Sequence, residues 1–172
     1  MIANGLWLVV FGLNTKLAFI LALVIMFVIL VTAIIILWHA LRTKLNAVEF
    51  ITLRVGFSIY AGWVTAASIV SASIAFKSLG LNTNEETWTL IILIVALLIY
   101  TAYSSLERNF VFGAMYIWVL VAIMGEQEKF GRESLVDKIL IILYIYIALF
   151  LSVTAFVFCE KKDGKCDRGL MF

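Results

Sequence analysis

The sequence contains no proline, a single histidine and only two cysteines among its 172 residues. Two cysteines cannot form the disulfide framework of a small secreted domain, and the absence of proline excludes a proline-rich linker. Charged residues make up only 14% of the chain, and 13 Lys+Arg against 11 Asp+Glu leave a formal charge of +2. That charge is too small to indicate nucleic acid as a partner.

The usual signatures of catalysis are also missing, because no glycine-rich phosphate loop, HExxH, GxSxG or CxxC pattern occurs. His39 is the single histidine, so one chain cannot hold a haem between two histidines. Its place beside Trp38 indicates a residue at the membrane interface, and an axial haem ligand is the alternative. Cys159 and Cys166 supply two thiols, whereas a tetrahedral metal site needs about four ligands. We therefore expect no metal site and no enzymatic activity, although the chain could be a non-catalytic subunit of an enzyme complex.

Apolar residues are abundant instead: 65% of the chain is hydrophobic, against about 45–50% in a soluble domain. Five apolar runs are long enough, or nearly so, to cross a bilayer as helices. The predicted membrane-spanning helices are 17–41, 55–76, 87–106, 109–124 and 135–158. The sequence thus predicts an all-α fold, a polytopic transmembrane helix bundle, with membrane lipids around it.

The two ends of the chain differ from these runs. Residues 1–13 would reach only about 20 Å as a helix, short of a bilayer core of about 30 Å, and predict a half-helix. Residues 159–172 form a polar tail. No internal repeat or second domain is visible, so we expect 1–172 to be a single transmembrane domain. More Lys and Arg residues are expected on the side of the membrane that holds the tail than on the opposite side. This bias predicts that the tail lies on the inner side, in the cytoplasm or mitochondrial matrix.

The second run carries the most informative pattern. At 100° per residue its small side chains fall on one broad face, which predicts close helix packing. The packing face includes Ser58, Gly62, Ala66 and Ser73. Arg54 extends this face toward the inner end; we interpret it as an interfacial anchor with Glu49, and binding of an acidic ligand group is the alternative.

Aromatic residues supply the candidate binding residues. Tyr60 and Trp63 project from the opposite side of the second run, and Trp118 lies in the middle of the fourth. A buried tryptophan needs a partner for its indole N–H. Core packing is one explanation for Trp118, and an aromatic ligand cavity shared with Trp63 is the other.

Three stretches resemble a divergent branch of the TspO/MBR superfamily of tryptophan-rich sensory and translocator proteins. The segment 57–69, FSIYAGWVTAASI, resembles its FSxYxGWxTxAtI signature, Asn4-Gly5-Leu6-Trp7 resembles its lNxlW motif, and the segment from Arg108 to Leu120 resembles its RxD helix with a central Trp. The chain departs from the pattern at Gly56, Ser71 and Ala122, where the branch has Pro, Asn and Gly. The lNxlW motif lies within that family's second helix, so we expect the first helix to be lacking here.

The resemblance implies a helical bundle without established enzymatic chemistry that binds tetrapyrroles or sterols in an aromatic cavity. Carried over to this chain, the ligand-binding residues would be Tyr60, Trp63, Thr65 and Trp118. Two hypotheses follow. The first in rank is an accessory subunit of a larger membrane complex, for example in the mitochondrial inner membrane, where another subunit supplies the missing N-terminal helix. The alternative is a TspO-like binding protein for a planar hydrophobic ligand, with a bound lipid, sterol or tetrapyrrole.

Overall fold

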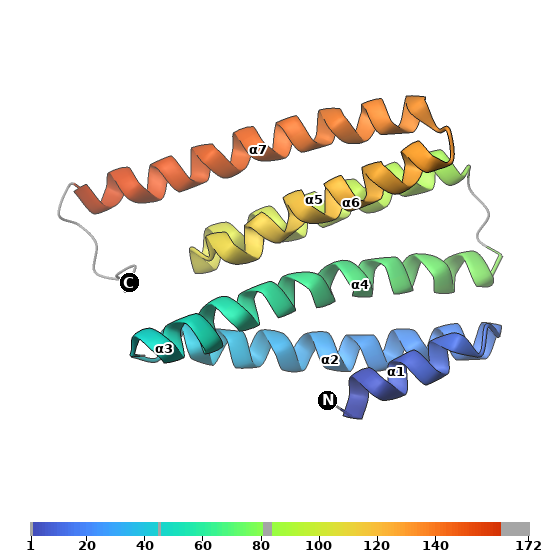
Figure 1. The fold of residues 1–172 in the computed structure, drawn as a ribbon, viewed down its shortest axis with the longest axis horizontal. Coiled ribbons are helices and arrows are strands. Elements are labelled where there is room, and N and C mark those ends of the chain that lie inside the picture. Colours follow the sequence, from blue (N-terminus) through green and yellow to red (C-terminus); the bar gives the residue numbers. More distant parts are fainter. Residues whose placement is uncertain (1, 45, 81–83, 163–172) are drawn as a thin grey trace. The chain divides into compact units, whose positions relative to one another are not determined.

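The computed structural model describes residues 2–44, 46–80 and 84–162, with side chains through residue 156. Within these ranges the chain forms helices and no strand (Figure 1). The helices are α1 (Ile2–Gly12), α2 (Lys16–Arg42), α3 (Ala47–Glu49), the π-helical turn η1 (Phe50–Val55), α4 (Gly56–Ser78), α5 (Glu85–Glu107), α6 (Phe110–Lys129) and α7 (Glu133–Lys162). The all-α prediction is confirmed.

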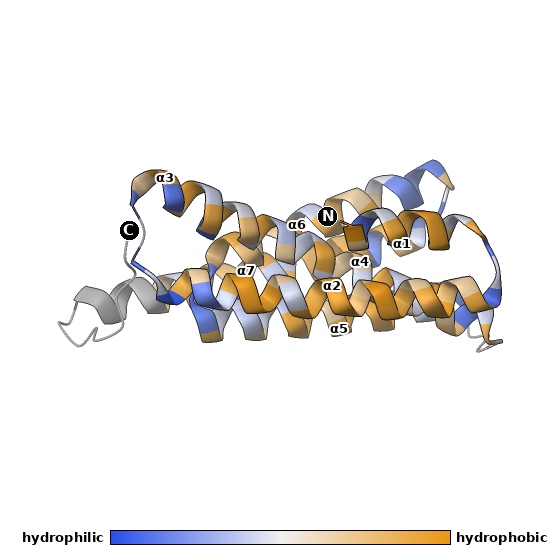
Figure 2. Ribbon diagram, turned by 90° about the horizontal axis from the view of Figure 1, so that it is seen from below, coloured by the Kyte–Doolittle hydropathy of each residue, from blue (hydrophilic) through white to orange (hydrophobic). Residues whose placement is uncertain are grey.

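In the part of the chain that the structure describes, five helical segments are long and apolar enough to cross a membrane: α2, the continuous segment Ala47–Ser78, α5, α6 and α7. The short helix α1 precedes them and has 11 residues. Apolar residues run along these helices, and hydrophilic residues concentrate near their ends (Figure 2). Because a bilayer requires each spanning segment to satisfy its own backbone hydrogen bonds, this pattern is that of an integral membrane protein.

The second span begins earlier than the apolar run that predicted it. Asn46 Oδ1 accepts from Glu49 N over 2.9 Å, and Glu49 Oε2 accepts from Asn46 N over 3.0 Å. This capping box starts the helix at Ala47, eight residues before the predicted start at 55, and η1 joins α3 to α4 without a break. At the other end of the chain α7 continues to Lys162, so only the start of the predicted tail is described. Cys166 and the side chain of Cys159 lie outside the described residues.

The chain divides into two compact units, residues 1–92 and residues 93–172. In the first unit α2 packs chiefly against α4. The buried residues of α2 recur at intervals of three and four, and four of them are alanine. They are Ala18, Ala22, Met26, Ile29, Ala33, Leu37 and Ala40. On α4 the small residues Ser58, Gly62 and Ala66 are also buried. Small side chains on two packed helices allow their backbones to approach closely.

The second unit is built around buried tyrosines. Tyr100 of α5, Tyr116 of α6 and Tyr146 of α7 are each at most 1% exposed. The rings of Tyr100 and Tyr116 stack at 5.0 Å, and Tyr146 meets Tyr116 edge-on at 4.7 Å. The Tyr116 hydroxyl donates to Leu93 O over 2.6 Å, and the Tyr146 hydroxyl donates to Gly113 O over 2.8 Å. Aromatic packing and hydrogen bonds between helices therefore hold this unit together.

Candidate functional site

A cluster in the first unit brings two of the quoted motifs into contact. Asn4 of α1 donates from Nδ2 to the Tyr60 hydroxyl over 2.9 Å, and that hydroxyl lies 3.1 Å from Asn4 Oδ1. Trp7 and Tyr60 both pack against the core residues Met26, Ile29 and Val64. The short helix α1 is thus fixed to α2 and α4 by a polar contact and an apolar one. Sequence reasoning quoted Asn4 and Trp7 as a motif and did not place them beside Tyr60.

The indole N–H of Trp7 is the unusual group in this cluster. Its Nε1 atom is shielded from solvent and has no hydrogen-bond acceptor among the described residues. One face of the indole is occupied by Phe11, whose ring centroid lies 5.2 Å away. A shielded N–H without an acceptor costs free energy that a bound molecule with an oxygen acceptor would recover. Trp7 is therefore the best-defined candidate ligand contact in the first unit.

The other predicted ligand-binding residues have different surroundings. Thr65 is buried, and its hydroxyl donates to Ala61 O of its own helix over 2.8 Å. Trp63 is 52% exposed near the middle of the second span, and Trp118 is 59% exposed near the middle of α6. Trp63 belongs to the first unit and Trp118 to the second, so neither unit contains the predicted pair.

Both exposed tryptophans lie at an unusual depth for their residue type. Tryptophan prefers the bilayer interface, where its N–H can reach water or headgroups. Trp63 and Trp118 lie in mid-span, and neither indole N–H finds an acceptor in the part of the chain that the structure describes. Hydrocarbon offers no acceptor at that depth. These two side chains are therefore suited to contact another molecule that covers them.

Arg54 occupies the junction between the first two spans. Its NH2 atom lies 3.1 Å from Ala40 O, 3.0 Å from Leu41 O and 3.2 Å from Thr43 O. The last carbonyls of a helix have no partner within the helix and carry partial negative charge. The guanidinium therefore closes the C-terminal end of α2 from a position 11–14 residues further along the chain.

Trp38 and Arg42 lie at the same end of α2. The guanidinium carbon of Arg42 sits 4.1 Å from the centroid of the Trp38 ring, and its NH1 atom donates to Trp38 O over 3.3 Å. The exposed His39 ring meets Trp38 edge-on at 5.0 Å. This arrangement is typical of a helix end at the membrane interface, where a tryptophan and a cation meet the headgroups.

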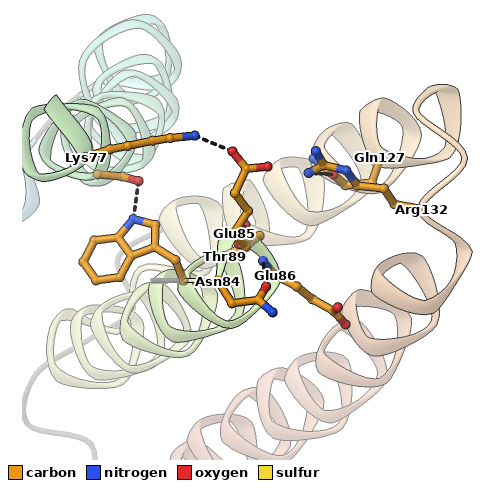
Figure 3. A network of polar contacts seen from close by, with 9 residues as sticks. Lys77, Asn84, Glu85, Glu86, Thr89, Gln127 and Arg132 are labelled. Carbon is orange, nitrogen blue, oxygen red and sulfur yellow. Dashed lines mark hydrogen bonds and ion pairs between the residues drawn. The ribbon is translucent and has the colours of Figure 1, made fainter. Parts of the chain in front are cut away.

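At the opposite end of the first unit, the charges are matched. Lys77 forms an ion pair with Glu85 across the α4–α5 connection (Figure 3). Trp88 of α5 donates its indole N–H to Ser73 Oγ of α4 over 2.8 Å, so Ser73 contributes a polar link between two helices. Across the described ranges, no group of three or more His, Cys, Asp or Glu side chains could hold a metal ion. The polar residues at this end of the first unit join helices to one another.

Comparison with known proteins gives one result. The chain matches the family described as TSPO-like protein over residues 1–157, which includes all five spans and the Asn4–Tyr60 contact. No curated protein and no solved structure gives a significant match. Because the match extends over most of the chain and agrees with the helical, membrane-spanning fold, this protein belongs to the TSPO-like protein family.

Proposed function

We propose that this protein is a non-catalytic accessory subunit of a larger membrane complex. The observation that carries the proposal is the pair of exposed mid-span tryptophans, Trp63 and Trp118, whose indole N–H groups have no acceptor among the described residues. A neighbouring transmembrane helix supplies acceptors at that depth through its Ser, Thr or backbone carbonyl groups, whereas lipid tails do not. The TSPO-like family is generally non-enzymatic, which supports a role without chemistry of its own.

Site-specific photo-crosslinking in the native membrane tests this proposal. A benzophenone side chain at position 63 or 118 should form discrete protein adducts. The matched control is position 98 on α5, where Leu98 is 61% exposed and carries no polar group; it should label lipid only. Lipid adducts alone at all three positions would contradict a partner subunit. A stable particle no heavier than one 19.3 kDa chain after extraction in mild detergent would contradict it as well.

A second candidate function is binding of a planar hydrophobic ligand, a tetrapyrrole or a sterol. The shielded Nε1 of Trp7 favours this second function, because an oxygen atom of a ligand could accept a hydrogen bond from it. Trp7 and Tyr60 pack against the same core of Met26, Ile29 and Val64. Titration of the purified protein with protoporphyrin and with cholesterol measures the affinity. Trp7→Phe should weaken binding by about tenfold, the value of one buried hydrogen bond, and Trp38→Phe should not. No binding at micromolar ligand, or equal loss in both variants, argues against this function.

We propose that the end of the bundle holding Arg42, Lys44 and Arg54 faces the cytoplasm or the mitochondrial matrix. These three residues make the α2–α3 junction the more basic end of the first unit. Short loops rich in Lys and Arg are retained on the inner side during insertion. Cysteine-accessibility labelling at Thr43 in sealed vesicles measures the sidedness. The location in a mitochondrial rather than a bacterial-type membrane is part of the same proposal.

A further inference from the structure

Helix α1 contacts the rest of the first unit through one half-buried face. None of its residues is buried. Its half-buried side chains, Ala3, Trp7, Val10 and Phe11, have the spacing of one face of a helix, and this helix packs chiefly against α2. Helix α1 can therefore separate from α2 without exposing a core residue of its own.

The turn between α1 and α2 leaves the two helices structurally separate. Asn14 has a φ of 51°, in the left-handed region, which ends the helical path of α1. Its Nδ2 atom donates to Gly12 O over 3.3 Å. Helix α2 then begins with its own cap, because Thr15 Oγ1 accepts from Ala18 N over 3.2 Å. A rotation of the backbone at residues 13–15 would change the angle between the helices without unwinding either one.

The docked position of α1 places polar groups at depth in the bilayer. Trp7 packs against Met26, which lies 10 residues along α2 from Lys16. At about 1.5 Å per residue this is about 15 Å, or about half of a hydrocarbon core of about 30 Å. Hydrocarbon offers no hydrogen-bond acceptor there. The polar side chains of α1 at this depth therefore depend on partners within the protein.

Two of these side chains have opposite effects on docking. The Asn4 amide hydrogen-bonds to the Tyr60 hydroxyl of α4, which stabilises the docked position. The Trp7 indole N–H is shielded and has no acceptor among the described residues, which destabilises it. At the bilayer interface, water and headgroups supply acceptors for an indole. An 11-residue helix is about 16 Å long, too short to span but able to lie along that interface.

We propose that α1 is a hinged lid that exchanges between the docked position and one at the bilayer interface. It pivots at residues 13–15, and the Asn4–Tyr60 hydrogen bond is its latch. Undocking uncovers the surface of Met26, Ile29 and Val64 against which Trp7 packs. The lid thereby controls the access of lipid-soluble molecules to this part of the first unit. The movement requires neither a partner subunit nor a ligand, so it is separate from both candidate functions.

Double electron–electron resonance on the full chain in lipid nanodiscs tests the proposal. Nitroxide labels are attached after Leu8→Cys on α1 and Ile59→Cys on α4, two exposed positions of the same unit. The native thiols are removed by Cys159→Ser and Cys166→Ser. The unmodified lid should give a main, short distance for the docked position and a minor, longer distance for the undocked one. The ratio of longer to shorter distance measures the exchange, with no ligand added.

Variants of the latch and of the indole should move this ratio in opposite directions. Tyr60→Phe removes the latch and should raise the ratio at least about fivefold, the effect of one hydrogen bond. The matched control is Thr32→Val, because the Thr32 hydroxyl donates to Val28 O of its own helix; the ratio should change less than about twofold. Replacing Trp7 by 3-benzothienylalanine exchanges the indole N–H for sulfur. In the Tyr60→Phe background it should lower the ratio about fivefold.

The same measurement gives the results that would overturn the lid. One unchanged distance in the parent chain and in Tyr60→Phe would show that α1 does not undock. Equal shifts in Tyr60→Phe and Thr32→Val would show that loss of any hydroxyl loosens the unit. A higher ratio with the benzothienyl side chain would show that the indole N–H does not oppose docking. The shorter distance, present in every variant, verifies that the first unit is folded.

Discussion

The two units handle buried polar atoms in different ways. In the first unit, the buried hydroxyls of Thr65 and Ser68 on α4 donate to carbonyls of their own helix, and four of the seven buried residues of α2, which packs chiefly against α4, are alanine. In the second unit, Tyr116 and Tyr146 are buried and donate to carbonyls 23 and 33 residues away. The first unit therefore depends on the closeness of two backbones, and the second depends on large side chains that link helices.

The largest expected effect comes from removing a ring in the second unit. Tyr116→Ala should lower the free energy of unfolding by about 3–5 kcal/mol, because it leaves a cavity among packed rings and removes the bond to Leu93 O. Unfolding in detergent, followed by circular dichroism, measures it. Tyr144→Ala is the control, since Tyr144 is 64% exposed on α7; its effect should be within about 0.5 kcal/mol. Similar losses in the two variants would contradict the tyrosine core.

The corresponding test in the first unit enlarges a buried side chain. Ala33→Leu should lower the free energy of unfolding by about 1–3 kcal/mol, because Ala33 is 2% exposed and a larger side chain separates the helices that pack there. Val28→Leu on the exposed side of α2 should be neutral. The same unfolding experiment compares them. An Ala33→Leu variant as stable as the parent would mean that close α2–α4 packing is unnecessary.

The smallest expected effects come from removing a single hydroxyl group in each unit. Tyr146→Phe keeps the ring but removes the donor to Gly113 O, and should lower the free energy of unfolding by about 1 kcal/mol. Thr65→Val removes a hydroxyl bonded within its own helix and should cost about half as much or less. Unfolding midpoints of the two variants give the ranking. The reverse order would remove the distinction between the two units.

Run length predicted four of the five spans directly, because a bilayer admits helices and little else at these lengths. The fourth run, 109–124, was slightly too short, and the structure extends its helix to Lys129. The buried face of α2 was not predictable in the same way. Lipid replaces water around it, so its exposed residues, such as Val24 and Val28, are as apolar as its buried ones. The Asn46–Glu49 capping box was visible in the sequence, and its spacing could have placed the helix start at Ala47.

The candidate site was only partly predictable for a related reason. The motif at 57–69 pointed to Tyr60, Trp63 and Thr65, but local sequence cannot show which hydroxyl is satisfied within its own helix. It also cannot show that Asn4 meets Tyr60 across 56 residues. The tyrosine core of the second unit lies in runs without polar contrast, so its members looked like ordinary apolar positions. Arg54 binds backbone carbonyls, and a pattern of residue types does not show which backbone carbonyls lie near a side chain.

The Arg54 junction has a consequence for how the chain is made. Ala40, Leu41 and Thr43, whose carbonyls accept from Arg54, precede it by 14 residues or fewer. The bonds from Arg54 to the end of α2 can therefore form as soon as this junction and the first turn of α4 have left the ribosome, before α5, α6 or α7 has been made. The second span then continues directly from this junction. The α2–α4 pair can therefore enter the bilayer as a preformed helical hairpin. Variants at Arg54 should accordingly slow co-translational insertion of the second span before they alter the mature protein.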